Sequence, residues 1–540
     1  MRIPKENHER EQFFCELISK CLSSRATRRT DYAILRSWFL FACGPDEAPA
    51  QYNKIQSHID QLTSFIYSAD TTRFSIPLGA SVDPEEENKV PVLTKAINDE
   101  WLNSNGDQVF SSAVNWALVF NSTFIKLVVD KNGGIHPYMV EPSNINVLRE
   151  DLPFTDRQEA IVQSYYITKS ELYSRLYSHP KRESIIKKLQ AVQHQPNETP
   201  SGIDRVITSA INPTMIGNVN LDLNGYNRMI ANVAEETIEM QELWVWDDEE
   251  NEYNVLTVAD PDIIIYDRKG SEIFLKGELP FIQVCPNPQY DYYWGQSEVS
   301  KLVLLQEMYN NRITEILTLL KLQVNPPVVL SGFMGIPDEK QFAMDREGSM
   351  LYSDTPGAKA DRLAPTMPQD IFAELNRLDD MFAEVSGISN ILAGRGESGV
   401  RSSGHASQLA RLGSSRPKKR ALIIEDSLEK VATLYLKLMQ EYDKTHYTAE
   451  NGMKFTAKQF TSDFTVKVDA HSNSPIFMED SRALAFNLFK VGVIGKEDLI
   501  NLVDPPRKQL LLSNLKKLPQ QPPPSHGKKP DLKLAGESGS

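Results

Sequence analysis

The chain has 540 residues, of which 41% are hydrophobic, and a formal net charge of -14. This length can bury a large core and is typical of about two to four domains. The sequence contains no apolar run of about 18 residues and no charged-then-apolar leader, so we expect neither a membrane-spanning nor a secreted protein.

The amino-terminal half predicts helices followed by strands. The clearest helix lies before Pro77, where four apolar residues recur at spacings of three and four: Ile55, Ile59, Leu62 and Ile66. In chain order we expect helices over 1–75, then helix, strand, Gly133-Gly134 turn and strand over 88–145, a polar surface excursion over 181–227, and strands at 240–246, 253–258, 262–266 and 464–468. Because these strands flank the central helices, we expect one discontinuous mixed domain.

The centre of the chain predicts two helices that enclose a turn-rich segment. The first helix begins after Ser297, an N-cap candidate, and ends at Asn325-Pro326-Pro327 because proline cannot continue a helix. Its apolar stripe is Leu302, Leu305, Tyr309, Ile313, Ile316 and Leu320. Residues 326–368 alternate turns with short apolar runs, Val328 to Leu330 and Met350 to Tyr352, which predict strands. The return helix over 369–385 carries Ile371, Leu375, Leu378, Phe382 and Val385 on one face.

A glycine-serine-rich loop over 387–404 follows, and then a long amphipathic helix over 420–442. We expect a shorter forerunner of this helix over 405–412, with a bend or break near residues 413–417. Between Arg395 and Arg420 seven cations stand against Glu397 alone. Such a run is either a solvated loop and helix start or a cationic belt that contacts DNA.

Several patterns that suggest catalysis do not fit their structural requirements. Gly394, Gly396 and Gly399 match G-x-G-x-x-G, but a nucleotide loop of that kind follows a strand, and here a helix precedes it. The acidic run at 247–250 is expected on a hairpin turn, where adjacent carboxylates do not converge on a metal. Residues 491–497 lack the Ser or Thr of a P-loop and predict a turn between helices. The four cysteines show no Cys-x-x-Cys pair, which favours reduced structural thiols.

The order of these elements resembles the portal proteins of tailed bacteriophages. The residues that carry the resemblance are GQSEV from Gly295, QEMYNNRITEIL from Gln306, SGI from Ser386, and the strand-rich segment NWALVFNSTFIKLVVDKNGGIHPYMVEPSNINV from Asn115 to Val147. The resemblance covers most of residues 30–500.

The resemblance implies an α+β fold: a portal-like subunit with a mixed wing domain, a two-helix stem, a small α/β clip, a flexible tunnel loop, a long wing helix and a helical crown. The implied segments are the wing over 1–296, stem helices over 297–322 and 369–386, the clip over 323–368, the tunnel loop over 387–404, the long helix with the rest of the wing over 405–475, the crown over 476–518 and a disordered tail over 519–540. The DNA-channel contacts would be Arg395, Arg401, Gly394, Gly396 and Gly399, with further cationic contacts from Arg411, Arg416, Lys418 and Lys419.

The resemblance also implies a function. The chain would form a ring of about twelve subunits with heterologous contacts, at one vertex of a phage capsid. The ring would be the channel for genome packaging and ejection, with no enzymatic activity, cofactor, metal or membrane. The implied partners are the large terminase subunit, major capsid and scaffolding proteins, tail adaptor proteins and double-stranded DNA bound without sequence preference. The protein would lie in the virion and, during assembly, in the bacterial host cytoplasm. The alternatives are a nucleotide-using enzyme acting through residues 394–399, and another ring-forming connector or tail component.

Overall fold

The protein is represented by a computed structural model, which divides into two compact units, Met1–Ile476 and Phe477–Ser540. The residues that the structure describes are 1–45, 47, 50, 52–67, 73–77, 89–130, 133–177, 179–191, 237–259, 263–324, 326, 328–331, 356–357, 359–362, 365–366, 368, 370–388, 415–448, 454–459, 464–468, 475–503, 511 and 515. No helix within these ranges has both the length and the apolar character needed to cross a membrane.

In the described residues, the first unit opens with the helices α1 (Asn7–Leu22), α2 (Arg25–Phe41), α3 (Lys54–Ile66), α5 (Val90–Asn103) and α6 (Gly106–Phe120). The predicted apolar face of α3 is confirmed, because Ile55, Ile59, Leu62 and Ile66 are all buried. The single helix expected after residue 88 is instead two helices. Asn105 separates them in a left-handed conformation (φ 56°), which asparagine adopts more readily than most residues.

Two antiparallel sheets follow, with strand orders β3-β2-β9 and β4-β5-β6-β7-β8. Their strands are β2 (Thr123–Val129), β3 (Ile135–Val140), β4 (Ile145–Val147), β5 (Ala160–Thr168), β6 (Thr237–Asp247), β7 (Glu252–Ala259), β8 (Ile263–Lys269) and β9 (Phe281–Val284). The strands predicted around residues 123–140 and 240–266 are therefore confirmed. The predicted strand at 464–468 is shorter, since only β14 (Lys467–Val468) forms and pairs with β1 (Phe74–Ser75).

The acidic turn between β6 and β7 directs its carboxylates to separate partners. Asp247 Oδ1 accepts a hydrogen bond from the Glu249 backbone N–H at 2.9 Å, whereas Glu249 pairs with Lys5 at 2.9 Å and Glu250 pairs with Lys269 at 2.6 Å. The carboxylates diverge, as the sequence predicted for a hairpin turn.

The surface excursion predicted over 181–227 is wrong for its first part. After α7 (Lys169–Arg175), residues Arg182–Ala191 form α8, and Ile185 and Leu189 are buried in one cluster with Ile263 and Ile265 of β8. The i, i+4 spacing of these two apolar residues lets a mainly polar segment pack as a helix against the sheet. Residues 192–227 lie outside the described part of the chain.

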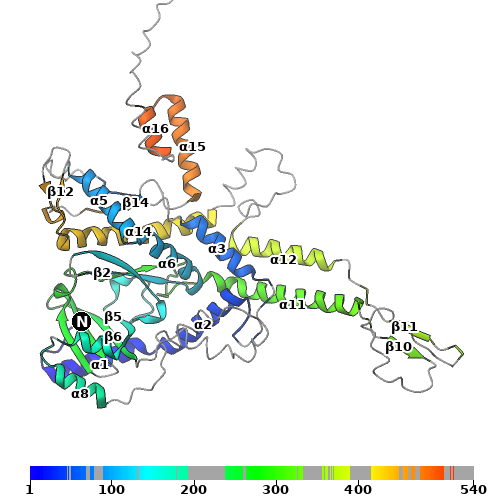
Figure 1. Ribbon diagram of the computed structural model, residues 1–540, viewed down its shortest axis with the longest axis horizontal. Coiled ribbons are helices and arrows are strands. Elements are labelled where there is room, and N and C mark those ends of the chain that lie inside the picture. The colour runs from blue at the N-terminus through cyan, green and yellow to red at the C-terminus, as the bar shows by residue number, and fades with distance from the viewer. Residues whose placement is uncertain are drawn as a thin grey trace, which may run out of the picture. The chain divides into compact units, whose positions relative to one another are not determined.

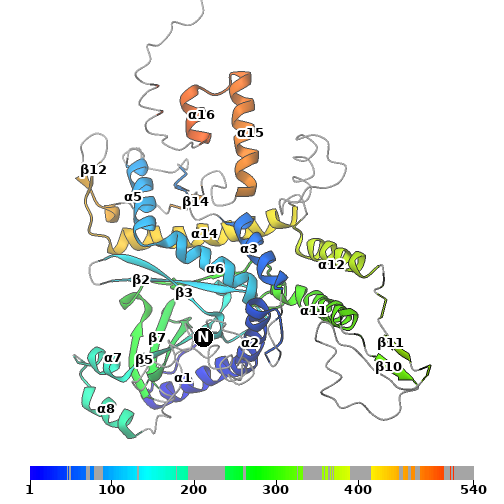
Figure 2. The same ribbon diagram turned by 45° about the vertical axis from the view of Figure 1, so that its right-hand side comes forward.

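Two long helices, α11 (Glu298–Val324) and α12 (Ile371–Ser386), form an arm that leaves the sheets of the first unit. Figures 1 and 2 show them side by side, with the antiparallel hairpin β10 (Val328–Ser331) and β11 (Lys359–Arg362) at the remote end. The predicted start and end of α11 are confirmed: Ser297 Oγ accepts from the Ser300 N–H at 3.4 Å, and the helix ends before the proline pair. Of the strands predicted between the helices, the one at 328–330 is confirmed and the one at 350–352 lies outside the described residues.

The return helix begins two residues later than predicted, at Ile371, and ends where Gly387 takes a left-handed conformation (φ 75°).

The long helix α14 (Ser415–Tyr442) begins earlier than predicted. Pro417 lies in its first turn rather than at a break, because the first N–H groups of a helix have no helical acceptor and proline's missing N–H costs nothing there. The forerunner helix predicted at 405–412 lies outside the described residues. Two short pairs, β12 (Tyr447–Thr448) with β13 (Lys454–Phe455) and β14 with β1, follow α14.

The second unit contains α15 (Pro475–Val491), whose first residues belong to the first unit, and α16 (Lys496–Val503). The helices predicted from residue 476 onward are confirmed as far as residue 503. The predicted turn at 491–497 is also confirmed, with Gly492 in a left-handed conformation (φ 79°). The predicted disordered tail over 519–540 lies outside the described residues.

Candidate functional site at the base of the arm

Most of the predicted DNA-contact residues lie outside the described part of the chain. These are Gly394, Arg395, Gly396, Gly399, Arg401 and Arg411. The structure places the backbone of Arg416 in the first turn of α14, followed by the half-buried Lys418 and the exposed Lys419. Of the predicted contact residues, the structure therefore describes the side chains of Lys418 and Lys419 alone, both in the first turns of α14.

Arg420 of α14 joins the helices on either side of the predicted loop. Its guanidinium donates to the carbonyl oxygen of Ser386, the last residue of α12, at 3.3 Å. It also donates to Asn287 Oδ1 at 3.1 Å and forms an ion pair with Glu298 at 2.6 Å. Arg420 therefore connects the end of α12 and the start of α11 to α14.

Glu298 completes this junction from the first turn of α11. Its side chain is 2% exposed and pairs with Lys301 at 3.0 Å as well as with Arg420. A carboxylate in the first helical turn also interacts favourably with the positive end of the helix dipole. Glu298 thus carries a buried negative charge that two cations and a helix terminus stabilise.

The segment before α11 supports the junction through one glycine. Gly295 has a φ of 73°, and a Cβ there would lie 2.5 Å from Cys285 Sγ and 2.7 Å from the Asn287 carbonyl oxygen. Only glycine satisfies both the conformation and the close approach.

Burial raises the pKa of the Cys285 thiol to about 12, which keeps the thiol protonated and unreactive. All four cysteines are free, in agreement with their interpretation as reduced thiols.

Arg420, the last of the seven cations in the run that begins at Arg395, fits neither expectation for that run. It is 8% exposed and paired with Glu298, so it is neither solvated nor available to a DNA backbone. Glu298 was not singled out at all. No local pattern identifies this pair, because the two residues come from different helices far apart in the sequence.

The outer face of α11 carries exposed apolar side chains. Leu304, Met308 and Leu322 are 66%, 44% and 39% exposed. At 3.6 residues per turn, Met308 lies about one turn and Leu322 about five turns beyond Leu304, so the three share one face. The opposite face is buried through Leu302, Leu305 and Ile316. We call Leu304, Met308 and Leu322 the outer stripe.

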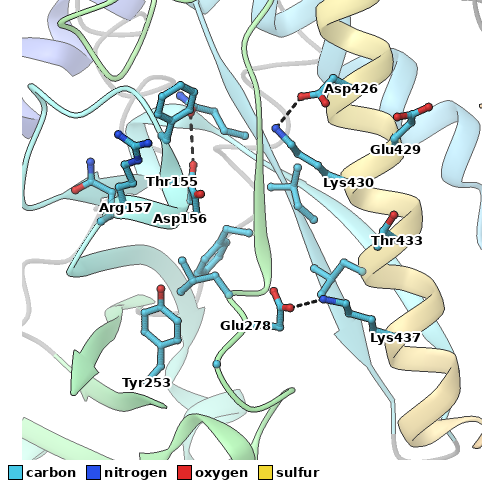
Figure 3. A pocket seen from close by; sticks show the side chains of 18 of the residues that line it. Thr155, Asp156, Arg157, Tyr253, Glu278, Asp426, Glu429, Lys430, Thr433 and Lys437 are labelled. Carbon is cyan, nitrogen blue, oxygen red and sulfur yellow. Dashed lines mark hydrogen bonds and ion pairs between the residues drawn. The ribbon is translucent and has the colours of Figure 1, made fainter. Parts of the chain in front are cut away.

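A cleft of about 890 Å³ lies between α14 and the strands of the first unit. Figure 3 shows two ion pairs in this cleft: Lys437 with Glu278 at 2.5 Å and Lys430 with Asp426 at 2.7 Å. Lys467, which also lines the cleft, pairs with Glu429 at 2.6 Å. The residues that line this cleft include no histidine, cysteine or serine.

A second cleft, of about 760 Å³, contains an internal ion pair. The Lys126 ammonium donates to Glu242 Oε1 at 2.9 Å and to Gln163 Oε1 at 2.6 Å. Burial opposes the charge of Glu242, but Lys126 and the Trp244 indole N–H outweigh it and hold the pKa of this carboxyl below its ordinary value. In the described residues no three His, Cys, Asp or Glu side chains are placed to hold a metal ion.

Comparisons with known proteins give structural likenesses but no match at the level of sequence. No family model matches the chain, and no curated protein matches it. One similar solved chain comes from the "Virion of native gene transfer agent (GTA) particle", with 10% identity, a TM-score of 0.42, and coverage of 88% of this chain and 94% of that one. Another comes from the "Neck of native GTA particle computed with C12 symmetry", with 9% identity, a TM-score of 0.39, and coverage of 88% and 93%. At these values the likeness assigns no family.

Proposed function

We propose that this protein is the portal of a tailed bacteriophage. In this role it forms a ring at one capsid vertex, serves as the channel for packaging and ejecting DNA, and binds the large terminase subunit and later the tail adaptor proteins. The observation that carries the proposal is a set of three exposed apolar side chains, Leu304, Met308 and Leu322, on the side of α11 opposite its buried residues. One face is buried within the arm and its root, and the outer stripe is left exposed.

In this proposal, the outer stripe contacts a second copy of the chain. The stripe lies on a different face of α11 from the residues that α12 and the N-terminal helices cover, so a contact with another copy joins two unlike surfaces. Contacts between unlike surfaces propagate from copy to copy, and they close into a ring when the rotation allows. The arms of such a ring line a common axis.

The base of the arm supports a channel role for the loop over 387–404. Arg420, in α14, donates to the carbonyl oxygen of Ser386 at the end of α12, so the helices on either side of the proposed loop are joined at the base of the arm. In a ring, that place is repeated once per subunit. A cation in the loop then becomes a belt, and phosphate contacts of such a belt are sequence-independent and individually weak.

The proposal makes the chain a structural component rather than an enzyme, with the packaging ATPase on a separate subunit. The experiment that tests it is particle imaging of the purified protein together with native mass measurement, across salt and protein concentration. Closed rings with a central hole are the expected result. A strictly monomeric compact particle under all conditions contradicts the proposal.

Two further measurements separate the alternatives. ATP hydrolysis by the isolated ring identifies a nucleotide-using enzyme acting through residues 394–399, and we expect none. Co-assembly with capsid and scaffolding proteins distinguishes a portal from a connector that joins later. A ring that never enters a capsid during its assembly contradicts the portal role and supports the connector.

A further inference from the structure

A buried lysine lies where the arm meets the N-terminal helices. Lys54, the first residue of α3, has a side chain that is 8% exposed and forms an ion pair with Asp379 of α12. Its ammonium lies 4.5 Å from the ring centroid of Tyr309, 5.5 Å from that of Tyr52 and 5.8 Å from that of Phe382. These distances are within the range of cation–π attraction. We call these five residues the lysine box.

The lysine box brings residues of three elements together around the Lys54 ammonium group. Tyr309 comes from α11, Phe382 and Asp379 come from α12, and Tyr52 directly precedes α3. The rings also contact each other, with centroids 6.0 Å apart for Tyr52 and Tyr309 and 6.4 Å apart for Tyr309 and Phe382. One ammonium group therefore holds both helices of the arm against α3.

Neutral hydrogen bonds surround the box. The Gln306 side chain, which is fully buried, accepts from the Lys54 backbone N–H at 3.0 Å and donates to the Tyr52 carbonyl oxygen at 3.0 Å. It also donates to Asn310 Oδ1 at 2.7 Å, and Asn310 in turn donates to the Ala42 carbonyl oxygen at 2.7 Å. These amides define the register of α11 against the N-terminal helices.

Beyond this root the two helices of the arm are tied to each other. Arg312 of α11 pairs with Glu374 of α12 at 2.7 Å. Figures 1 and 2 show the helices lying side by side away from the sheets. The arm is therefore a pair of connected helices that is attached to the rest of the first unit at its root.

We propose that the lysine box is the latch of a hinge at the root of the arm. When the arm tilts away from α3, the Lys54 ammonium loses its contacts with the rings of Tyr309 and Phe382 and with the Asp379 carboxylate, while Tyr52 stays beside it. Asp379 is 30% exposed and Tyr52 is 55% exposed, so water reaches the separated groups and the opening is reversible. A fully enclosed charge would instead make separation prohibitively costly.

The consequence is a mechanical connection between the tip and the body. A force applied to the hairpin at the end of the arm acts on the box, and through Lys54 on the first turn of α3. This inference concerns the root of the arm in a single chain, so it holds or fails whether or not the protein forms rings.

The experiment measures the arm angle and the opening of the root in the full chain. Spin labels at Thr318→Cys on α11 and Lys95→Cys on α5, in a Cys15→Ser and Cys285→Ser background, report the distance between arm and body. Labelled chains are diluted with unlabelled chains so that one labelled copy is observed at a time. Backbone hydrogen exchange at residue 54 reports the root directly, because this N–H is bonded to Gln306.

We expect Lys54→Met to broaden the distance distribution and to speed exchange at residue 54 by about tenfold. Lys54→Arg is the matched control that keeps the cation, and it should remain close to the parent. Asp379→Asn should shift both readouts in the same direction as Lys54→Met but less. Unchanged exchange in β5 to β7 shows that each variant is folded.

Two results overturn the latch. One is a distance distribution and exchange rate in Lys54→Met that equal those of the parent. The other is a Lys54→Arg variant as broad as Lys54→Met, because the packing of a lysine stem rather than its charge would then hold the arm.

Discussion

At the scale of single residues, buried charges connect segments that are distant in the sequence. Arg420 links α14 to Glu298 of α11 and to the end of α12, and Lys54 links α3 to both helices of the arm. Both pairs have at least one side chain that is about one-tenth exposed or less. Because a buried charge without its partner is costly, these pairs specify one arrangement of the helices and disfavour others.

Loss of the Arg420 side chain should lower the free energy of unfolding far more than loss of the neighbouring Lys419 side chain. Arg420→Met leaves Glu298 buried with Lys301 alone and should lower the free energy of unfolding by about 3 kcal/mol, as measured by chemical denaturation. Lys419→Met, at the exposed neighbouring position, is the control and should change it by less than about 0.5 kcal/mol.

A double variant tests whether the two charges act as a pair. Glu298→Met combined with Arg420→Met removes both charges, so it should cost less than the sum of the two single changes. Additive losses would show that Arg420 stabilises the junction without Glu298.

At the scale of elements, α11 combines three kinds of surface. Its inner face packs in the arm, its amides at Gln306 and Asn310 meet the N-terminal helices, and its outer stripe is exposed. A solvent-facing helix normally carries one apolar face. In the proposed ring, the outer stripe contributes to assembly, whereas the inner face contributes to the fold of the single chain.

The outer stripe predicts loss of assembly without loss of fold. Leu304→Gln with Met308→Gln should abolish ring formation in native mass measurement, because both side chains are exposed in the single chain and buried only by another copy. Thermal unfolding should change little, since exposed apolar residues contribute little to the monomer.

Glu307→Gln is the control. It introduces a glutamine at an exposed position between Leu304 and Met308 in the sequence, and it should leave assembly intact. Rings of the double variant that dissociate at the same protein concentration as the parent would show that the stripe is not the interface.

At the scale of the whole molecule, the proposed ring multiplies each loop cation by the number of subunits. The chain as a whole is acidic, with a net charge of -14, so a duplex in such a channel meets few tight contacts. A small number of arginines in the loop then suits a channel that holds DNA without locking it.

Arg395→Ala with Arg401→Ala should therefore leave ring assembly intact and impair packaging or retention of DNA, most clearly at low salt, where the arginine–phosphate contacts of the parent are strongest. The measurement is the DNA content of particles after assembly and after storage at several salt concentrations. Ser402→Ala with Ser403→Ala changes the same loop without removing a cation and is the control. Particles of the arginine variant that fill, retain DNA and infect like the parent would show that these arginines are solvated loop residues.

The sequence by itself determined the local elements, because their signals are short-range. Apolar spacing of three and four placed α3 and α11, the proline pair after Val324 ended α11, and Gly387 ended α12 through its left-handed conformation. Backbone sterics and helix periodicity act within a few residues, so one chain is enough to read them. The same rules gave a wrong boundary for α14, because Pro417 is tolerated in a first turn.

The tertiary structure alone decided which distant residues meet. Thr123 of β2 pairs with Val284 of β9, Lys54 is enclosed by rings from two other helices, and Arg420 is buried on Glu298. A cation in the sequence looks the same whether it is solvated or paired, since the difference lies in burial and in a partner that no spacing rule identifies. One weak signal was present: Gln306 and Asn310 lie four residues apart beside the apolar face of α11, where amides need partners once buried. Long-range packing supplies those partners, and it therefore decides which charges remain free for function.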